Sequence, residues 1–293
     1  MHESTGFGTP KGSGLLMATV AHPFAPPAIH SIPEIPEAPV VASTQPNVFV
    51  VPAYNERENI VRLLEDIESR PALYATAGSR VIVVDDGSDD GTADVVAHYA
   101  GPLPVEVVRL GENQGPGSAF RAGFAAALSD SDEEAFVVTL EADTTSDLDA
   151  LPEMLARASA GAELVLASVH GGGRMLNVSP LRRVLSRGSG WVIRRALGVQ
   201  PQTVSSFFRV YRASLLRTAG SHYGDRLIRE SGFVCKAELL AKLAAIGARI
   251  EEVPVDLDGS RRIGPSKMPV FKTLVGYWRL LLRRGLRLER GVA

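Results

Sequence analysis

Short apolar runs that alternate with amphipathic segments constrain the fold of this chain more than any other feature of its sequence. Between the runs, residues 58–69 and 148–160 repeat apolar side chains at spacings of three and four, which is typical of helices. Strands that alternate with helices in this way form a parallel sheet with helices on both faces. We therefore predict an α/β fold around a mostly parallel central sheet. The predicted strands are residues 48–53, 80–86, 105–110, 135–143 and 163–169.

The chain of 293 residues is long enough for one principal domain with a small attachment. Residues 1–46 contain eight prolines and no helical or strand period, so we predict a disordered tail there. The principal domain is predicted at residues 47–265 and includes a basic amphipathic segment at residues 174–199. Residues 266–293 again combine apolar and basic side chains, which predicts an amphipathic C-terminal helix.

Net charge and cysteine content limit the possible binding partners of the chain and its cellular compartment. The formal net charge of −2 argues against a general nucleic-acid-binding protein. The single cysteine, Cys235, cannot form an internal disulfide, which fits a reducing cytoplasm, and no apolar run is long enough to predict a membrane-spanning helix. Nine arginines and no acidic residue lie between Glu163 and Asp225. This segment and the C-terminal helix are therefore suited to the anionic inner face of a membrane, on which we expect a peripheral protein.

Polar clusters follow three of the predicted strands directly, at residues 52–58, 85–92 and 141–143. Ligands of parallel sheets bind at the carboxyl ends of the strands, so these clusters predict a binding site at one sheet edge. The alternative is that each cluster only makes a turn or begins a helix, with Thr92 as a helix N-cap. The occurrence of all three at the same edge favours the binding site.

Two carboxylates, Glu141 and Asp143, flank Ala142 at the end of a predicted strand. The strand period of two would send both carboxylates to the same side, where like charges repel. A hard divalent cation that bridges them to a diphosphate would relieve this repulsion, which predicts a Mg²⁺ or Mn²⁺ site. A solvated strand end is the alternative.

Six motifs give the chain a family resemblance when they are taken in order. The chain resembles glycosyltransferase family 2 over about residues 47–272, and within that family it is most similar to the dolichyl-phosphate and polyprenyl-phosphate mannose synthases. The motifs are PAYNERENI, VIVVDDGSDDGT, NQGPGSAFRAGF, the strand-end EAD, SFFRVYR and RRIGPSKM.

This resemblance implies a GT-A type nucleotide-binding fold, a nucleotide-sugar donor and a divalent cation held by Glu141 and Asp143. Arginine suits a diphosphate because its planar guanidinium binds phosphate oxygens in pairs, although a structural ion pair is the alternative for Arg209. The residues implied in catalysis are Asp143, Arg209 and Lys267. Those implied in binding the donor and cation are Pro52, Ala53, Tyr54, Glu56, Asp85, Asp86, Glu141, Ala142, Asp143, Arg209, Arg261, Ser266 and Lys267.

The chain also departs from the family pattern. The metal motif begins with Glu141 where the family usually has aspartate, and Thr145 stands at a place often held by glutamine. Val169 stands where the lipid-phosphate synthases have an arginine, and Phe207 replaces a glycine. The departures at Val169 and Phe207 concern the acceptor side of the site.

The resemblance implies a polyprenyl or dolichyl phosphate acceptor, bound by Arg182, Arg183 and Ser205, and transfer with inversion at the anomeric carbon. A phosphate acceptor is already an anion near neutral pH, so it needs no strong protein base.

Three alternatives stay open at this point. A soluble sugar or other hydroxyl acceptor would need a base, for which Asp225, Glu230 and His170 are candidates. A sugar nucleotidyltransferase would also use an α/β sheet and a metal. A non-catalytic nucleotide-sugar binder is expected to lack the paired carboxylates, which this chain has.

Overall fold

The computed structural model describes residues 44–177, 190–191, 193–195, 198–264 and 270–285. Nearly all of the predicted tail, and parts of the predicted basic segment and C-terminal helix, lie outside these residues.

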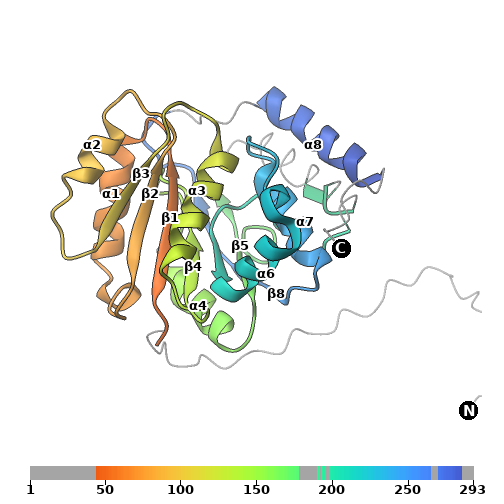
Figure 1. Ribbon diagram of the computed structural model, residues 1–293, viewed down its shortest axis with the longest axis horizontal. Helices are drawn as coiled ribbons and strands as arrows, with labels where there is room; N and C mark the ends of the chain where they lie inside the picture. Colours follow the sequence, from red (N-terminus) through yellow and green to blue (C-terminus); the bar gives the residue numbers. More distant parts are fainter. Residues whose placement is uncertain (1–43, 178–189, 192, 196–197, 265–269, 286–293) are drawn as a thin grey trace, which may run out of the picture. The chain divides into compact units, whose positions relative to one another are not determined.

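The central sheet has seven strands in the order β3-β2-β1-β4-β7-β5-β8 (Figure 1). Every neighbouring pair is parallel except the two that involve β7, which runs antiparallel to β4 and β5. The predicted mostly parallel sheet is therefore confirmed. The strands are β1 (Asn47–Ala53), β2 (Arg80–Asp85), β3 (Val105–Arg109), β4 (Phe136–Thr139), β5 (Leu164–Ser168), β7 (Arg209–Arg212) and β8 (Ile250–Pro254).

Helices cover both faces of the sheet because both faces are apolar. In β1, Val48 and Val50 belong to one buried cluster while Phe49 and Val51 belong to the other. The cluster of Phe49 includes helices α1 (Arg57–Glu68), α2 (Thr92–Ala97) and α4 (Leu151–Ser159). The cluster of Val48 includes α3 (Pro116–Ser129), α6 (Ala213–Tyr223), α7 (Cys235–Ala245) and α8 (Val270–Gly285).

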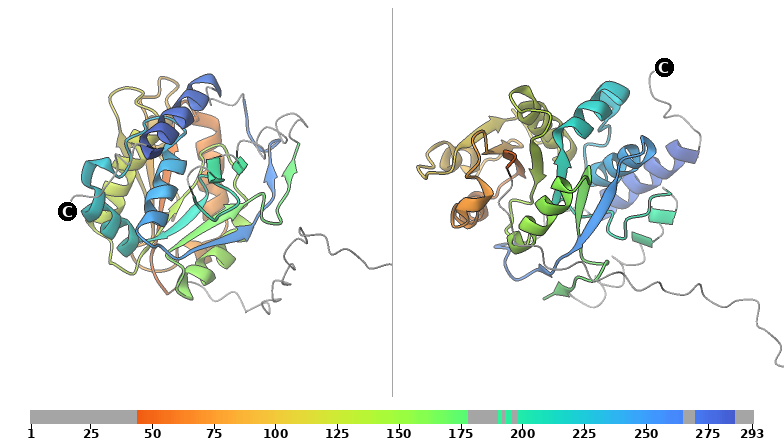
Figure 2. Two further views of the ribbon diagram at one scale, coloured as in Figure 1. Left: turned by 90° about the vertical axis from the view of Figure 1, so that its right-hand side faces the viewer. Right: turned by 90° about the horizontal axis from the view of Figure 1, so that it is seen from below.

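The predicted C-terminal helix corresponds to α8, which lies beside the start of α7 in both views of Figure 2. A Cβ atom added at Gly276 would meet Cγ2 of Val234 at 2.8 Å, so glycine allows this close approach. The opposite face of α8 is exposed and apolar. Within the described part of the chain, no helix combines the length and apolar character that crossing a bilayer requires.

Short elements complete the fold. In the described part of the chain, three 3₁₀ helices connect the larger elements: η1 (Pro71–Leu73), η2 (Leu148–Ala150) and η3 (Gly224–Arg226). A separate two-stranded parallel sheet pairs β6 (Met175–Leu176) with β9 (Leu257–Asp258). This small sheet places the loop after β9, residues 259–264, over the edge of the main sheet that carries the site.

Candidate active site

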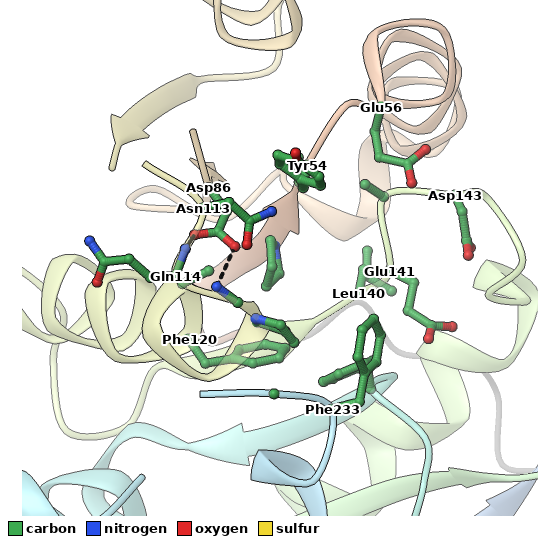
Figure 3. Close-up of a pocket in the computed structure, with 18 of the residues that line it drawn as sticks. Tyr54, Glu56, Asp86, Asn113, Gln114, Phe120, Leu140, Glu141, Asp143 and Phe233 are labelled. Carbon is green, nitrogen blue, oxygen red and sulfur yellow. Dashed lines mark hydrogen bonds between the residues drawn. The ribbon is translucent and has the colours of Figure 1, made fainter. Parts of the chain in front are cut away.

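A pocket of about 410 Å³ opens at the carboxyl edge of the parallel strands (Figure 3). This volume lies in the range of small-molecule sites. The loops after β1, β2 and β4, which carry the three sequence clusters, contribute polar side chains, and the loop after β3 and the C-terminal part of the chain contribute others. The predicted site residues that line it are Pro52, Ala53, Tyr54, Glu56, Asp86, Glu141, Ala142 and Asp143.

One end of the pocket is built by hydrogen bonds between the loops after β1, β2 and β3. The carboxylate of Asp86 accepts hydrogen bonds from the backbone N–H groups of Gln114 and Gly115, both at 2.8 Å. These bonds hold the loop before α3 at the pocket wall (Figure 3). Burial raises the pKa of Asp86, and the two backbone hydrogen bonds oppose that rise. This end of the pocket therefore combines a buried carboxyl group with fixed backbone geometry.

The loop after β1 is tied to the loop after β2. The backbone N–H of Asn55 donates to Ser88 Oγ at 2.9 Å, and that of Glu56 donates to Thr92 Oγ1 at 2.9 Å. Thr92 is therefore not the N-cap of α2, a position that Gly91 holds with φ 85°. Its hydroxyl instead fixes the position of Glu56, which lines the pocket.

Asp85 does not line the pocket, although the sequence grouped it with Asp86. It lies at the end of β2 and is buried. Its Oδ2 is 3.4 Å from the N–H of Ser88, whereas its Oδ1 has no hydrogen-bond partner among the described residues. An unsatisfied buried acceptor costs free energy, and Asp85 is not among the residues that line the pocket.

The opposite end of the pocket is acidic. β4 ends at Thr139, so Glu141 and Asp143 lie in the turn beyond it, and the expected strand period does not set their direction. Instead, Thr144 adopts φ 62°, and the hydroxyl of Thr145 lies 2.6 Å from Asp143 Oδ1 and 3.3 Å from Glu141 Oε2. The turn thus brings both carboxylates to the same end of the pocket (Figure 3).

Two cationic side chains that the sequence analysis did not single out accompany these carboxylates. Arg262 Nη2 is in direct contact with Asp143 Oδ2. Lys236 is buried beneath the pocket, with its Nζ 3.9 Å from the centre of the Phe207 ring. Burial lowers the pKa of Lys236 to about 8, while the negative charge of Glu141 opposes that shift. The acidic end of the pocket is therefore partly neutralised by the chain itself.

Aromatic rings form the floor between the two ends of the pocket. Phe120 and Phe207 stack with ring centres 5.1 Å apart, and Phe207 meets Phe233 edge-on at 5.9 Å. All three line the pocket. Phe207 was noted in the sequence only as a replacement for glycine. The structure shows that its ring joins α3 to the loop before α7.

Arg209 does not line the pocket, so its expected contact with a diphosphate does not follow from the geometry. Its side chain is 1% exposed. The guanidinium donates to the backbone carbonyls of Ser206 at 2.9 Å, Lys236 at 3.0 Å and Val204 at 3.2 Å. These bonds join β7 to the loop before it and to α7, so Arg209 positions the aromatic floor from behind.

Two further predicted residues, Arg261 and Ser205, do not line the pocket. Arg261 turns away from it and pairs with Asp66 of α1 at 3.3 Å, while its neighbour Arg262 reaches Asp143. Ser205 is exposed and does not line the pocket. The predicted residues Arg182, Arg183, Ser266 and Lys267 lie outside the described residues. Lys272 of α8, which the sequence did not single out for the site, does line the pocket.

The helix-covered sheet and the pocket with paired carboxylates at its edge define an α/β protein with a ligand site at the carboxyl ends of its strands. The profile of glycosyl transferase family 2 matches residues 48–220, which is more than half of the chain. This chain belongs to glycosyl transferase family 2.

Two relatives resemble the chain over most of their length. The polyprenol monophosphomannose synthase of Mycolicibacterium smegmatis is 31% identical over 78% of this chain and 83% of that protein. The undecaprenyl-phosphate mannosyltransferase of Micrococcus luteus is 31% identical over 75% of this chain and 86% of that protein.

Solved structures support the fold. The glucosyl-3-phosphoglycerate synthase of Mycobacterium tuberculosis, solved with Mn²⁺, uridine diphosphate and phosphoglyceric acid, is similar with a TM-score of 0.54. The match covers 83% of this chain and 78% of that chain, at 19% identity. Together with the family match, this similarity identifies the fold as GT-A type.

Proposed function

We propose that this enzyme is an inverting glycosyltransferase that moves a sugar from a nucleotide-sugar, GDP-mannose or a UDP-sugar, to a polyprenyl phosphate at a membrane surface. One observation carries the proposal. The pocket has a nucleoside-sized polar end and a paired-carboxylate end, and its rim includes Lys272 of α8, a helix whose outer face is apolar.

The donor would bind along the pocket. Its nucleoside would bind at the end formed by Tyr54, Asp86 and the loop before α3. Its diphosphate would reach the acidic end, where Glu141 and Asp143 can share a Mg²⁺ or Mn²⁺ ion with it. The described residues contain no group of three His, Cys, Asp or Glu side chains that could hold a metal alone. Two carboxylates fit a cation whose other ligands come from a diphosphate.

The chain's own residues suit direct displacement at the anomeric carbon. When bound, the divalent cation would supply neutralisation of the charge that develops on the departing diphosphate. Asp143 would hold that end of the donor, and the ammonium of Lys272 adds positive charge at the rim. Lys267 lies outside the described residues, and its place in the family motif implies that it binds the same group. A phosphate acceptor attacks as an anion, so no residue has to remove a proton from it.

The outer face of α8 suits a lipid surface. Leu274, Trp278 and Leu282 follow one another at intervals of four and are 56%, 67% and 57% exposed. Helical spacing of four puts them on one face, opposite the buried Leu280. Trp191, from the basic segment, is 61% exposed. Exposed indole and leucine side chains beside cationic residues are typical of helices that lie in a membrane interface.

A nucleotide-release assay tests the proposed reaction. The enzyme is incubated with Mg²⁺ or Mn²⁺ and with GDP-mannose or several UDP-sugars, with or without a short polyprenyl phosphate. We expect release of nucleoside diphosphate from one donor to require the lipid phosphate. Donor hydrolysis that ignores the lipid would contradict the lipid acceptor and favour a soluble one. Release of pyrophosphate would identify a nucleotidyltransferase instead.

Replacing the apolar face of α8 tests the membrane surface separately. The double variant Leu274→Ser, Trp278→Ser should bind vesicles of equal phosphatidylglycerol and phosphatidylcholine at least about tenfold more weakly, because each large apolar side chain contributes about 1.5–3 kcal/mol when buried. Leu176→Ser, an exposed leucine of β6, is the matched control and should bind as the unaltered protein does. Equal vesicle binding by all three proteins in a flotation assay would contradict a role of α8 at the membrane.

A further inference from the structure

The loop of residues 259–264 is fastened over the acidic end of the pocket from its outer side. Asn59 of α1 makes two hydrogen bonds with Ile263, one from its Nδ2 to the carbonyl at 3.0 Å and one from the Ile263 N–H to its Oδ1 at 3.1 Å. Arg62 of α1 donates to the carbonyl of Arg261 at 3.3 Å. These contacts attach the loop backbone to α1.

Arg262 extends from this loop onto Asp143. Its side chain is 23% exposed, whereas that of Asp143 is 5% exposed. The Nε of Arg262 is buried without a hydrogen-bond partner among the described residues. Its guanidinium therefore uses only part of its donor capacity, which leaves an N–H for an additional acceptor.

The backbone beside Asp143 is coupled to the same loop. Thr144 has φ 62°, which is strained for a β-branched residue, and its hydroxyl donates to the carbonyl of Arg261 at 2.9 Å. The hydrogen bond from the Thr144 hydroxyl to the Arg261 carbonyl thus lies next to the side-chain contact between Asp143 and Arg262. The two side chains can separate while the loop remains attached to α1.

Arg262 and a divalent cation would compete for the same carboxylate oxygen. An arginine contributes one positive charge in a spread-out guanidinium, while Mg²⁺ or Mn²⁺ brings two charges and binds oxygen directly. A cation that arrives with a diphosphate would therefore displace the arginine from Asp143. The freed guanidinium could then donate to phosphate oxygens, which it binds well. Lys236 differs from Arg262 in that it cannot exchange partners in this way, because it is buried in the core near Glu141.

We propose that Arg262 is an exchangeable donor-binding residue, which pairs with Asp143 in the free protein and moves to the donor diphosphate when a divalent cation takes Asp143. This proposal rests on the nucleotide-sugar donor of the proposed function, but it does not depend on the acceptor.

Binding measurements without any acceptor test this exchange. Mn²⁺ affinity is measured by electron paramagnetic resonance of the free ion in the absence of nucleotide, and affinity for GDP and UDP by calorimetry at saturating Mn²⁺. Arg262→Ala should bind Mn²⁺ about tenfold more tightly than the unaltered protein, since one competing charge-assisted hydrogen bond is lost. The same variant should bind the nucleoside diphosphate about tenfold more weakly.

Two further variants separate the exchange from a general loosening of the loop. Arg262→Lys keeps the positive charge and should stay within about threefold of the unaltered protein for Mn²⁺, because the ion pair is retained. Arg62→Gln weakens the attachment of the loop to α1 while leaving the Asp143 contact, and it should not change Mn²⁺ affinity. Thermal melts of all variants verify that they are folded.

The outcomes distinguish the exchange from the donor chemistry. Unchanged Mn²⁺ affinity in Arg262→Ala would overturn the proposal. The proposal would also be overturned if Arg262→Ala bound both Mn²⁺ and nucleotide more tightly than the unaltered protein does, because Arg262 would then only block the site. If the unaltered protein bound neither GDP nor UDP with Mn²⁺, the donor chemistry of the proposed function would be overturned as well.

Discussion

Replacing Asp143 with asparagine is expected to lower the release of nucleoside diphosphate by at least about a hundredfold, which is the typical loss when a main source of transition-state charge stabilisation is removed. Asp143 is almost fully buried, and it has both Thr145 and Arg262 as partners. Asparagine has nearly the same shape, so the turn should be preserved while the negative charge that attracts a cation is lost. Initial rates at saturating donor measure the effect.

Asp147→Asn is the matched control for this substitution. Asp147 lies four residues further along, where its side chain accepts a hydrogen bond from the N–H of Asp149 at the start of η2. Asparagine can accept the same bond, and the residue does not line the pocket. We expect its turnover to stay within about twofold, as for other surface changes that keep a helix cap. Unchanged turnover in Asp143→Asn would contradict a role for Asp143 in catalysis.

Most of the strands that were predicted have an apolar environment on both sides, and the partly exposed edge strand β3 is the exception. β1, β2 and β4 are covered by helices on both faces, so nearly every residue in them is apolar and the runs stand out in the sequence. β7 was missed because two of its four residues are arginines. The charge of Arg209 is compensated by three backbone carbonyls, and that of Arg212 by Glu134 at 3.0 Å. None of these partners can be identified before the chain is folded.

The edge strand β8 was missed for a different reason. It contains Glu251 and Glu252 and is half exposed. Glu252 accepts hydrogen bonds from the backbone N–H groups of Gln202 at 2.7 Å and Thr203 at 2.9 Å, so its charge holds a loop rather than marking a surface segment. Polar residues with such distant partners break the apolar pattern on which strand prediction depends.

The candidate site was predictable where it depends on strand ends and less so where it depends on side-chain direction. Parallel strands end at one edge, which brought Tyr54, Asp86 and Asp143 to one pocket. Adjacent residues of an extended chain point to opposite sides, so Asp85 and Asp86 could not both face the ligand. Which of the two arginines, Arg261 or Arg262, faces the pocket depends on how the loop lies against α1. The motif contains no information on that contact.

The loop before α7 depends on a buried ion pair that the motifs did not reveal. Glu238 is fully buried and accepts hydrogen bonds from the backbone N–H groups of Arg229 at 2.9 Å and Glu230 at 2.8 Å. Its other oxygen accepts from Lys242 Nζ at 2.6 Å. These bonds fix the chain that leads to Phe233 in the pocket floor.

Glu238→Ala is therefore expected to lower the free energy of unfolding by about 3 kcal/mol, because it leaves the charge of Lys242 and two backbone N–H groups buried without their partner. Urea unfolding at constant pH measures this change. Glu153→Ala is the control: Glu153 pairs with Arg157 at an exposed helical position, where such a pair contributes about 0.5 kcal/mol or less. A loss as small as that of the control would show that the loop before α7 is held by other contacts, of which the bond from Gly117 N–H to the Ser231 carbonyl at 2.7 Å is the nearest candidate.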